Sequence, residues 1–170
     1  MGVELRRARA EDAEPLTELG RITFDETFGH RYPAEDLAHF LATEHTPEKY
    51  AGWIADPAWG VWVVEQDGGM MGYTLAGPCG LPHPDITPAC GELKRIYVLS
   101  SAQGLGAGSL MLKESLDWLT KPGRNLWIGV WSENDGAQRL YARHGFEKVG
   151  TYDFVVGDSR DHEFILKREG

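Results

Sequence analysis

The stretch Gly91–Leu119, GELKRIYVLSSAQGLGAGSLMLKESLDWL, decides the fold. It opens with Leu93–Leu99, an apolar and β-branched run that favours a strand. Gln103–Gly108 follows with glycines at every second position, and an amphipathic helix begins directly after it. Glycine lacks a Cβ, so a ligand can approach the backbone closely, and the free N–H groups at a helix start attract anions. The stretch therefore predicts a site for a phosphate or pyrophosphate group.

Two better-known glycine motifs do not match this loop. A P-loop requires Lys and then Ser or Thr directly after its last glycine, whereas Ser109 and Leu110 follow Gly108. The dinucleotide motif G-x-G-x-x-G, counted from Gly104, requires a glycine at position 109, which is serine. The loop therefore favours neither a nucleoside triphosphate nor a dinucleotide.

Composition narrows the class of protein. The chain has 170 residues, 42% of them hydrophobic, and a net charge of −9. We expect one domain over residues 1–170, with a neutral or cationic small-molecule partner. A basic stripe for nucleic acid is missing, and so are a membrane-spanning apolar run and a signal peptide. Cys79 and Cys90 are interpreted as free thiols of a cytoplasmic protein, with a disulfide between them as the alternative. The histidine spacing predicts no metal site.

Hydrophobic periodicity predicts the order of elements. A strand over residues 3–8 precedes helices over 10–28, 33–44 and 47–56. Strands over 59–65 and 70–75 follow, joined by a turn at 67–69, and residues 77–89 form a loop. After the opening stretch come a strand over 126–131, a helix over 136–144, and strands over 146–156 and 163–167. The helix after the glycine loop is expected to bury Leu105, Leu112, Leu116 and Leu119. This order predicts an α/β (α+β) sheet with mixed strand directions.

The glycine loop also matches Gln/Arg-x-x-Gly-x-Gly/Ala, with Gln103, Gly106 and Gly108 at the defining positions. Together with the strand Ile96–Val98 and the segment from Asn134 to Phe146, it resembles the GNAT superfamily of N-acetyltransferases. The resemblance covers essentially the whole chain. It implies the GNAT fold, a mixed, mostly antiparallel seven-stranded sheet flanked by helices, with splayed central parallel strands. It also implies acetyl-coenzyme A (acetyl-CoA) as the acetyl donor.

A narrower resemblance points to the acceptor. Thr23–Gly29, Gly129–Trp131 and Phe154–Asp158 look like the PaiA-like branch, which is associated with polyamine acetylation. This implies a small, cationic primary amine as acceptor, attacking directly in a ternary complex. A protein or peptide amine, an antibiotic, and a coenzyme-A-binding sensor without catalysis stay open as alternatives. The sequence leaves monomer and homodimer equally open.

The resemblance also implies which residues bind the coenzyme. The strand before the loop would offer backbone groups to the pantetheine arm, and the glycine loop would bind the pyrophosphate. Downstream polar side chains would bind the pantetheine or a phosphate. The predicted coenzyme-binding residues are Ile96, Tyr97, Val98, Gln103, Gly104, Leu105, Gly106, Ala107, Gly108, Asn134, Tyr141 and Arg143. Helix capping is an equally open role for Asn134, and a solvated helix position is the alternative for Arg143.

Acetyl transfer to an amine requires a base for the ammonium proton and an acid for the departing thiolate. Tyr141 matches the tyrosine that acts as acid in the family, and the alternative is a tyrosine that only packs in the core. Glu92 matches a glutamate that acts as base in several members, and the alternative is a solvated glutamate at a strand end. Acidic and aromatic side chains would bind a cationic acceptor through charge and cation–π contacts. The predicted acceptor-binding residues are Glu26, Phe28, Tyr32, Trp131 and Phe154, near Asp25 and Asp153.

Overall fold

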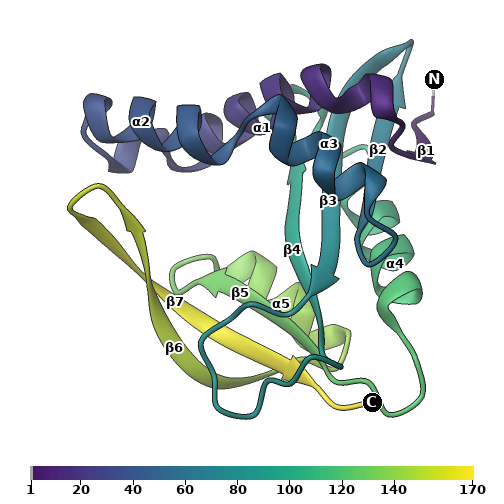
Figure 1. Ribbon diagram of the computed structural model, residues 1–170, viewed down its shortest axis with the longest axis vertical. Helices are drawn as coiled ribbons and strands as arrows, with labels where there is room; N and C mark the ends of the chain where they lie inside the picture. Colours follow the sequence, from purple (N-terminus) through teal and green to yellow (C-terminus); the bar gives the residue numbers. More distant parts are fainter. Residues whose placement is uncertain (1) are drawn as a thin grey trace.

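A computed structural model describes residues 2–170 (Figure 1). Within that range seven strands form one sheet in the order β1-β2-β3-β4-β5-β7-β6. The β4–β5 pair is parallel, and the other neighbouring pairs in the described chain are antiparallel. The strands are β1 (Glu4–Arg7), β2 (Gly60–Gln66), β3 (Gly69–Pro78), β4 (Gly91–Val98), β5 (Leu126–Trp131), β6 (Glu147–Val156) and β7 (Ser159–Arg168). The expected mixed, mostly antiparallel sheet is confirmed.

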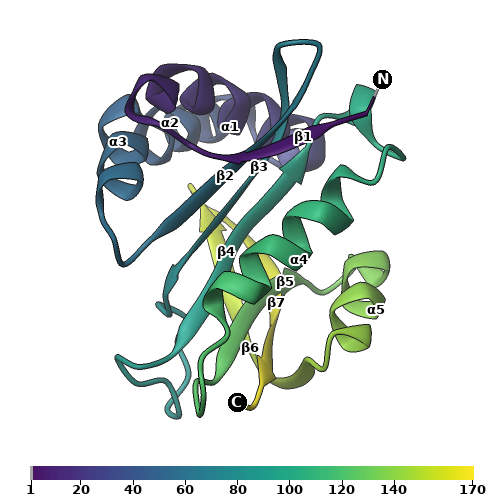
Figure 2. The same cartoon turned by 90° about the vertical axis from the view of Figure 1, so that its right-hand side faces the viewer.

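Helices cover both faces of this sheet (Figures 1 and 2). One face carries α1 (Ala13–Phe28), α2 (Ala34–Glu44) and α3 (Pro47–Ala55), and the other carries α4 (Ala107–Leu119) and α5 (Asp135–Arg143). Strand alternation explains the two layers, because successive side chains point to opposite faces. On β3, Tyr73 and Leu75 pack with α1 and α3, whereas Ala76 joins the core beneath α4 after a register shift.

Local sequence sets most helix ends as predicted. The Thr46 side chain accepts a hydrogen bond from the Lys49 N–H at 3.2 Å and caps α3, and Asn134 caps α5 through Ala137 N–H at 3.1 Å. Gly145 follows α5 with φ of +89°, a left-handed conformation that glycine adopts without strain. These caps explain why the predicted and observed helices agree closely here.

One helix prediction is wrong. Leu105 does not share the buried face of α4, because the helix begins at Ala107 and Leu105 lies in the loop with 49% of its surface exposed. Met111 and Ser115 join Leu112, Leu116 and Leu119 on the buried face instead. Two strands are also longer than predicted, since β3 extends to Pro78 and β7 begins at Ser159.

The parallel pair β4–β5 is joined at one end only. The two strands are paired only from Gly91 to Leu93, opposite Leu126 to Ile128. The strands then separate, as Figure 1 shows, and the register of β4 against β3 shifts near the point of separation. The predicted splay is therefore confirmed, and it leaves backbone N–H and C=O groups of both strands without a β4–β5 partner.

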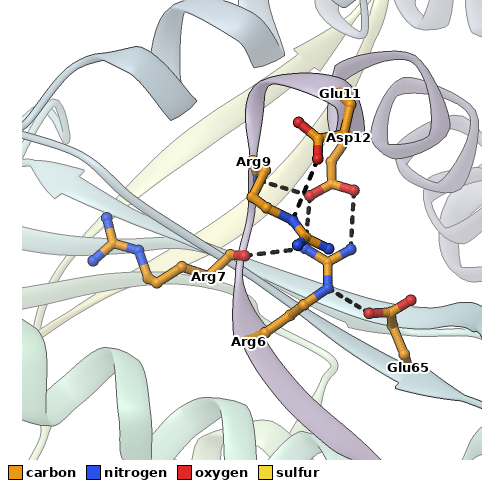
Figure 3. A network of polar contacts seen from close by, with 6 residues as sticks. All are labelled: Arg6, Arg7, Arg9, Glu11, Asp12 and Glu65. Atoms are coloured by element: carbon orange, nitrogen blue, oxygen red, sulfur yellow. Dashed lines mark hydrogen bonds and ion pairs between the residues drawn. The ribbon is translucent and has the colours of Figure 1, made fainter.

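A charged network attaches the N-terminal strand to the sheet (Figure 3). The Arg6 guanidinium of β1 donates to both carboxylate oxygens of Asp12, at 2.7 and 3.0 Å, and also contacts Glu65 of β2. Asp12 additionally accepts the Arg9 backbone N–H at 2.6 Å. The hydrogen bonds from Arg6 hold the pKa of Asp12 below its usual value. The network joins β1, β2 and the turn that leads into α1.

Candidate active site

Two cavities meet where β4 and β5 separate. The larger, which we call the cleft, has a volume of about 620 Å³ and lies between the splayed strands, with α1, α2, β6 and β7 contributing side chains. The smaller, which we call the loop pocket, has a volume of about 430 Å³ and lies against the glycine loop and α5. Both are lined by Ile96, Val98, Gln103 and Tyr141. The shared lining makes them two parts of one site.

The glycine loop is shaped to receive a phosphate group. Gly104 and Gly106 have φ of +86° and +80°, which other residues adopt only with strain. A Cβ placed on Gly104, Gly106 or Gly108 would meet no atom within 4 Å, so the space in front of the loop is open. The first N–H groups of α4 start at this loop and have no partner within the helix. The residues present therefore fit a pyrophosphate.

Tyr141 of α5 lines both cavities. Its side chain is buried in the core beneath α4, and only 7% of its surface is exposed. Among residues 2–170 its hydroxyl has no hydrogen-bond partner. Burial raises the pKa of Tyr141 to about 12, so the phenol keeps its proton at neutral pH. A protonated phenol at the junction of two cavities can donate a proton or a hydrogen bond to a group bound there.

Glu163 of β7 is a cleft residue that the sequence analysis missed. It lies opposite Trp131 of β5 and Tyr152 of β6 in the sheet. The Tyr152 hydroxyl donates to its carboxylate at 3.3 Å, and no cation of the described chain pairs with it. Burial raises the pKa of Glu163 to about 7. The detectable signal was a carboxylate two positions before the buried Ile165, on the same strand face.

Glu92, the predicted base, also lines the cleft but is held by other groups. Its Oε1 atom accepts the Gly80 N–H at 3.0 Å and pairs with the Lys94 ammonium at 3.0 Å. Only 7% of the residue is exposed. Because Oε1 is already occupied by the ion pair and the hydrogen bond, only the second oxygen of Glu92 is free, within residues 2–170, to take a proton from a substrate.

A protein-family model described as "Acetyltransferase (GNAT) family" matches residues 19–146. The chain belongs to this family. Its expected chemistry is thus that of an N-acetyltransferase, with acetyl-CoA as donor. In this acetyltransferase the loop pocket is lined by the glycine-loop residues that the sequence resemblance predicts to bind the coenzyme.

Known proteins similar to this acetyltransferase span nearly its whole length. An uncharacterized N-acetyltransferase of Lactobacillus delbrueckii subsp. lactis is 31% identical, over 98% of this chain and 97% of its own. A phosphinothricin N-acetyltransferase of Streptomyces coelicolor is 28% identical, over 88% and 85%. The crystal structure of PaiA N-acetyltransferase from Thermoplasma acidophilum, in complex with coenzyme A, has a TM-score of 0.78 at 21% identity and full coverage of both chains. The last likeness demonstrates the shared fold.

The predicted coenzyme residues of the acetyltransferase fall into three groups. Those that line the loop pocket are Ile96, Val98, Gln103, Gly104, Gly106, Ala107, Gly108 and Tyr141. Tyr97 and Asn134 line the cleft. Leu105 and Arg143 are exposed and line neither cavity. The structure therefore brings together all but two of this predicted set.

The predicted acceptor residues divide similarly. Phe28, Trp131 and Phe154 line the cleft, and the rings of Phe28 and Trp131 meet edge-on at 6.0 Å. Glu26 and Tyr32 do not line it. The Glu26 carboxylate instead accepts hydrogen bonds from the backbone N–H and hydroxyl of Ser100, and the Tyr32 hydroxyl donates to Asp161 of β7. Both hold the walls of the cleft in place from outside.

Two further features of residues 2–170 bear on function. No helix there is long and apolar enough to cross a membrane. No cluster of three or more His, Cys, Asp and Glu side chains in that range is arranged to bind a metal ion.

Proposed function

We propose that residues 1–170 form one N-acetyltransferase domain that moves the acetyl group of acetyl-CoA to a primary amine of a small molecule. The observation that carries this proposal is the free, protonated Tyr141 hydroxyl at the junction of the loop pocket and the cleft. A cleft of about 620 Å³ has the size of small-molecule sites. Both cysteines are free thiols, which suits the proposed cytoplasmic location.

The proposed coenzyme site consists of the loop pocket and the end of β4 at Ile96–Val98. Gln103 to Gly108 would bind the pyrophosphate, and the open backbone of Ile96–Val98 would pair with the pantetheine arm. Asn134 and Tyr141 complete the set near the sulfur. The coenzyme supplies an activated acetyl thioester. The related fold of PaiA, solved with coenzyme A, supports this placement.

Glu163 is the proposed base and Tyr141 the proposed acid. Glu163 first takes one proton from the ammonium into its carboxylate, and the neutral amine nitrogen then forms the C–N bond while the C–S bond breaks. Tyr141 gives its proton to the sulfur, and the second proton, lost from the new amide nitrogen, restores the Tyr141 hydroxyl. A base with a pKa of about 7 is well matched to neutral pH. Glu92 stays the alternative base, since it lines the same cleft.

The acceptor is found with a panel of amines and a thiol-release assay. Polyamines test the PaiA resemblance, phosphinothricin tests the likeness to the Streptomyces relative, and amino acids, aminoglycosides and peptides complete the panel. We expect thiol release with at least one small amine. Coenzyme A binding without thiol release from any amine would contradict the proposal and favour a non-catalytic sensor.

Two variants separate the candidate bases. We expect Glu163→Gln to lower kcat by about 10²-fold or more, which is the ordinary contribution of a general base. Glu92→Gln is expected to change kcat less, because Glu92 is already bound by Lys94 and Gly80. The reverse ranking would return the role of base to Glu92.

A further inference from the structure

The charges that line the cleft are unequally paired. Four of its carboxylates have a cation of the described chain beside them. These pairs are Glu44 with Lys49 at 3.1 Å, Glu92 with Lys94 at 3.0 Å, Asp153 with Arg160 at 3.7 Å and Asp161 with Arg31 at 2.6 Å. Two groups of opposite sign remain without an ionic partner in residues 2–170, namely Arg95 and Glu163.

Arg95 of β4 is held by neutral groups. Its Nη1 atom donates to the Tyr50 hydroxyl at 3.1 Å and lies 3.5 Å from Nδ1 of His45. The guanidinium also lies 5.1 Å from the Trp53 ring centre. Burial, aided by the nearby Arg95 charge, lowers the pKa of His45 to about 3, so this imidazole is neutral. The surroundings therefore orient Arg95 without cancelling its charge.

An arginine set into a cavity wall in this way suits an anionic ligand. Its guanidinium remains charged at any physiological pH, and taking it out of water costs free energy that neutral partners recover only in part. A carboxylate matches its planar donors with two parallel hydrogen bonds. The cleft wall at Arg95 thus has the chemistry of a carboxylate site.

Arg95 and Glu163 belong to one neighbourhood around Tyr97. Burial, and then the Tyr73 hydroxyl, raise the pKa of Tyr97, while the positive charge of Arg95 lowers it. Glu163 and Tyr141 add smaller upward effects. All four side chains line the cleft, so a ligand bound there lies among the unpaired cation, the unpaired carboxylate and the proposed acid.

We propose that the acceptor is a zwitterion of the amino-acid type, with its carboxylate on Arg95 and its amine facing Glu163. This inference rests on the proposed acetyl transfer, and it replaces the purely cationic acceptor expected from sequence. An amine that lacks a carboxylate would leave Arg95 unpaired in the filled cleft. Of two amines that differ only in a carboxylate, the cleft should therefore prefer the one that carries it.

The test uses pairs of acceptors that differ only in the carboxylate. Phenylalanine is compared with phenethylamine, and lysine with cadaverine, by thiol release from acetyl-CoA. Amino-acid methyl esters, which keep the amine and lose the negative charge, form a third arm. We expect kcat/KM for the carboxylate member to exceed that of its partner by about 10²-fold in at least one pair, the usual effect of a charge-assisted hydrogen-bonded pair.

Variants assign the discrimination to Arg95. Arg95→Gln should reduce the kcat/KM ratio within a pair by about tenfold or more, chiefly through KM for the amino acid, and Arg95→Lys should retain part of it. Arg21→Gln is the matched control. Arg21 donates to the His45 carbonyl at 2.8 Å but does not line the cleft, so the ratio should persist. Calorimetric binding of the amino acid to wild-type protein gives a readout that needs neither a variant nor turnover.

The outcomes are distinct. Equal use of both members of every pair, or a preference for polyamines, would overturn the zwitterion proposal and leave acetyl transfer intact. An unchanged ratio in Arg95→Gln would overturn the role of Arg95. If none of the amines causes thiol release, the proposed function is overturned. Calorimetric binding of the amino acid would then still support the carboxylate site.

Discussion

At the residue scale, burial sets the protonation of the two groups proposed to move protons. Tyr141 keeps its proton because its phenol is buried in the core beneath α4, and Glu163 holds a proton up to about pH 7 because it lies within the cleft. The Tyr141 hydroxyl has no partner among residues 2–170 that would favour its deprotonated form. For Glu163 only the Tyr152 hydroxyl, which donates to the carboxylate, favours the charged form. An acid and a base can thus coexist at neutral pH in one cavity.

Tyr141→Phe should lower kcat by about 10²-fold, because the variant removes the proton donor and keeps the ring that packs in the core. Steady-state thiol release measures kcat, and calorimetry with coenzyme A measures binding. We expect the dissociation constant of coenzyme A to change less than about threefold. Turnover equal to wild type would contradict the assignment of Tyr141 as acid.

The pH dependence of activity should follow Glu163. As pH rises through about 7 the carboxyl loses its proton and becomes the base, so kcat should rise across that range. The groups facing it, Tyr152 and Tyr97, titrate well above this range, and Asp161 stays charged through it. Glu163→Gln should therefore lose this inflection. A rise near pH 7 that persists in the variant would point to another base.

Stability should respond to the same group with the opposite sign. Between pH 4.5 and about 7 the folded state holds the Glu163 proton that the unfolded chain has released, so the free energy of unfolding falls as pH rises. Glu163→Gln should remove the cost of burying the charge and gain about 3 kcal/mol at pH 8 relative to pH 4.5. Urea unfolding at both pH values measures the difference. An equal effect of the variant at both pH values would contradict the pKa assigned to Glu163.

At the element scale, the start of α4 combines backbone conformation with ligand access. The loop passes through left-handed φ at Gly104 and Gly106 directly before α4, and the first residues of α4 line the loop pocket. The glycines leave open space in front of them. The strand before the loop separates from β5 and so exposes backbone groups beside the same pocket. The proposed coenzyme site thus draws much of its lining from main chain.

Gly106→Ala should weaken coenzyme A binding about tenfold or more, because a Cβ would occupy the approach to the loop and strain a positive φ. Gly123→Ala is the matched control, since Gly123 has φ of +74°, equally open surroundings and a position outside both cavities. Both variants should lose similar stability, of the order of 1 kcal/mol. Calorimetry with coenzyme A distinguishes them, and equal binding by both would contradict the phosphate-loop assignment.

At the scale of the whole molecule, one carboxylate joins the N-terminal helices to the C-terminal hairpin. Asp161 of β7 accepts from the Arg31 guanidinium at 2.6 Å and from the Tyr32 hydroxyl, both at the corner between α1 and α2. Phe24, Phe40 and Phe154 pack beside this contact. The hairpin reaches toward α2 in Figure 1, and the cleft lies between these two parts. Elements far apart in sequence thereby line one cleft.

Asp161→Ala should lower the free energy of unfolding by about 2 kcal/mol, because Arg31 and Tyr32 lose a buried partner. KM for the acceptor should rise while coenzyme A binding changes little. Asp117→Ala, which removes an exposed pair with Lys113 on α4, is the control and should leave stability nearly unchanged, because solvent screens the pair. Denaturant unfolding and steady-state kinetics make the comparison. Equal losses of stability would contradict the bridging role of Asp161.

The sequence by itself determined the features that depend on neighbours in the chain. Helix caps at Thr46 and Asn134, the glycine loop, and the order of strands and helices all follow from residues a few positions apart. The error at Leu105 has the same origin, because its spacing fits a helix face while the helix begins only at Ala107, after the left-handed Gly106. Hydrophobic periodicity predicts which positions share a helix face, but it does not predict the residue at which the helix begins.

Only the tertiary structure decided which charged side chains of the cleft have no ionic partner in the described chain. Arg95 and Glu163 lie 68 positions apart in the sequence, and both resemble ordinary strand residues there. Their significance comes from the cations that occupy the other cleft carboxylates and from the neutral groups around Arg95. Charge pairing and burial depend on distances across the sheet, which no local pattern encodes. For this reason the glycine loop was recognisable from sequence, whereas the unpaired charges behind the proposed acceptor preference were not.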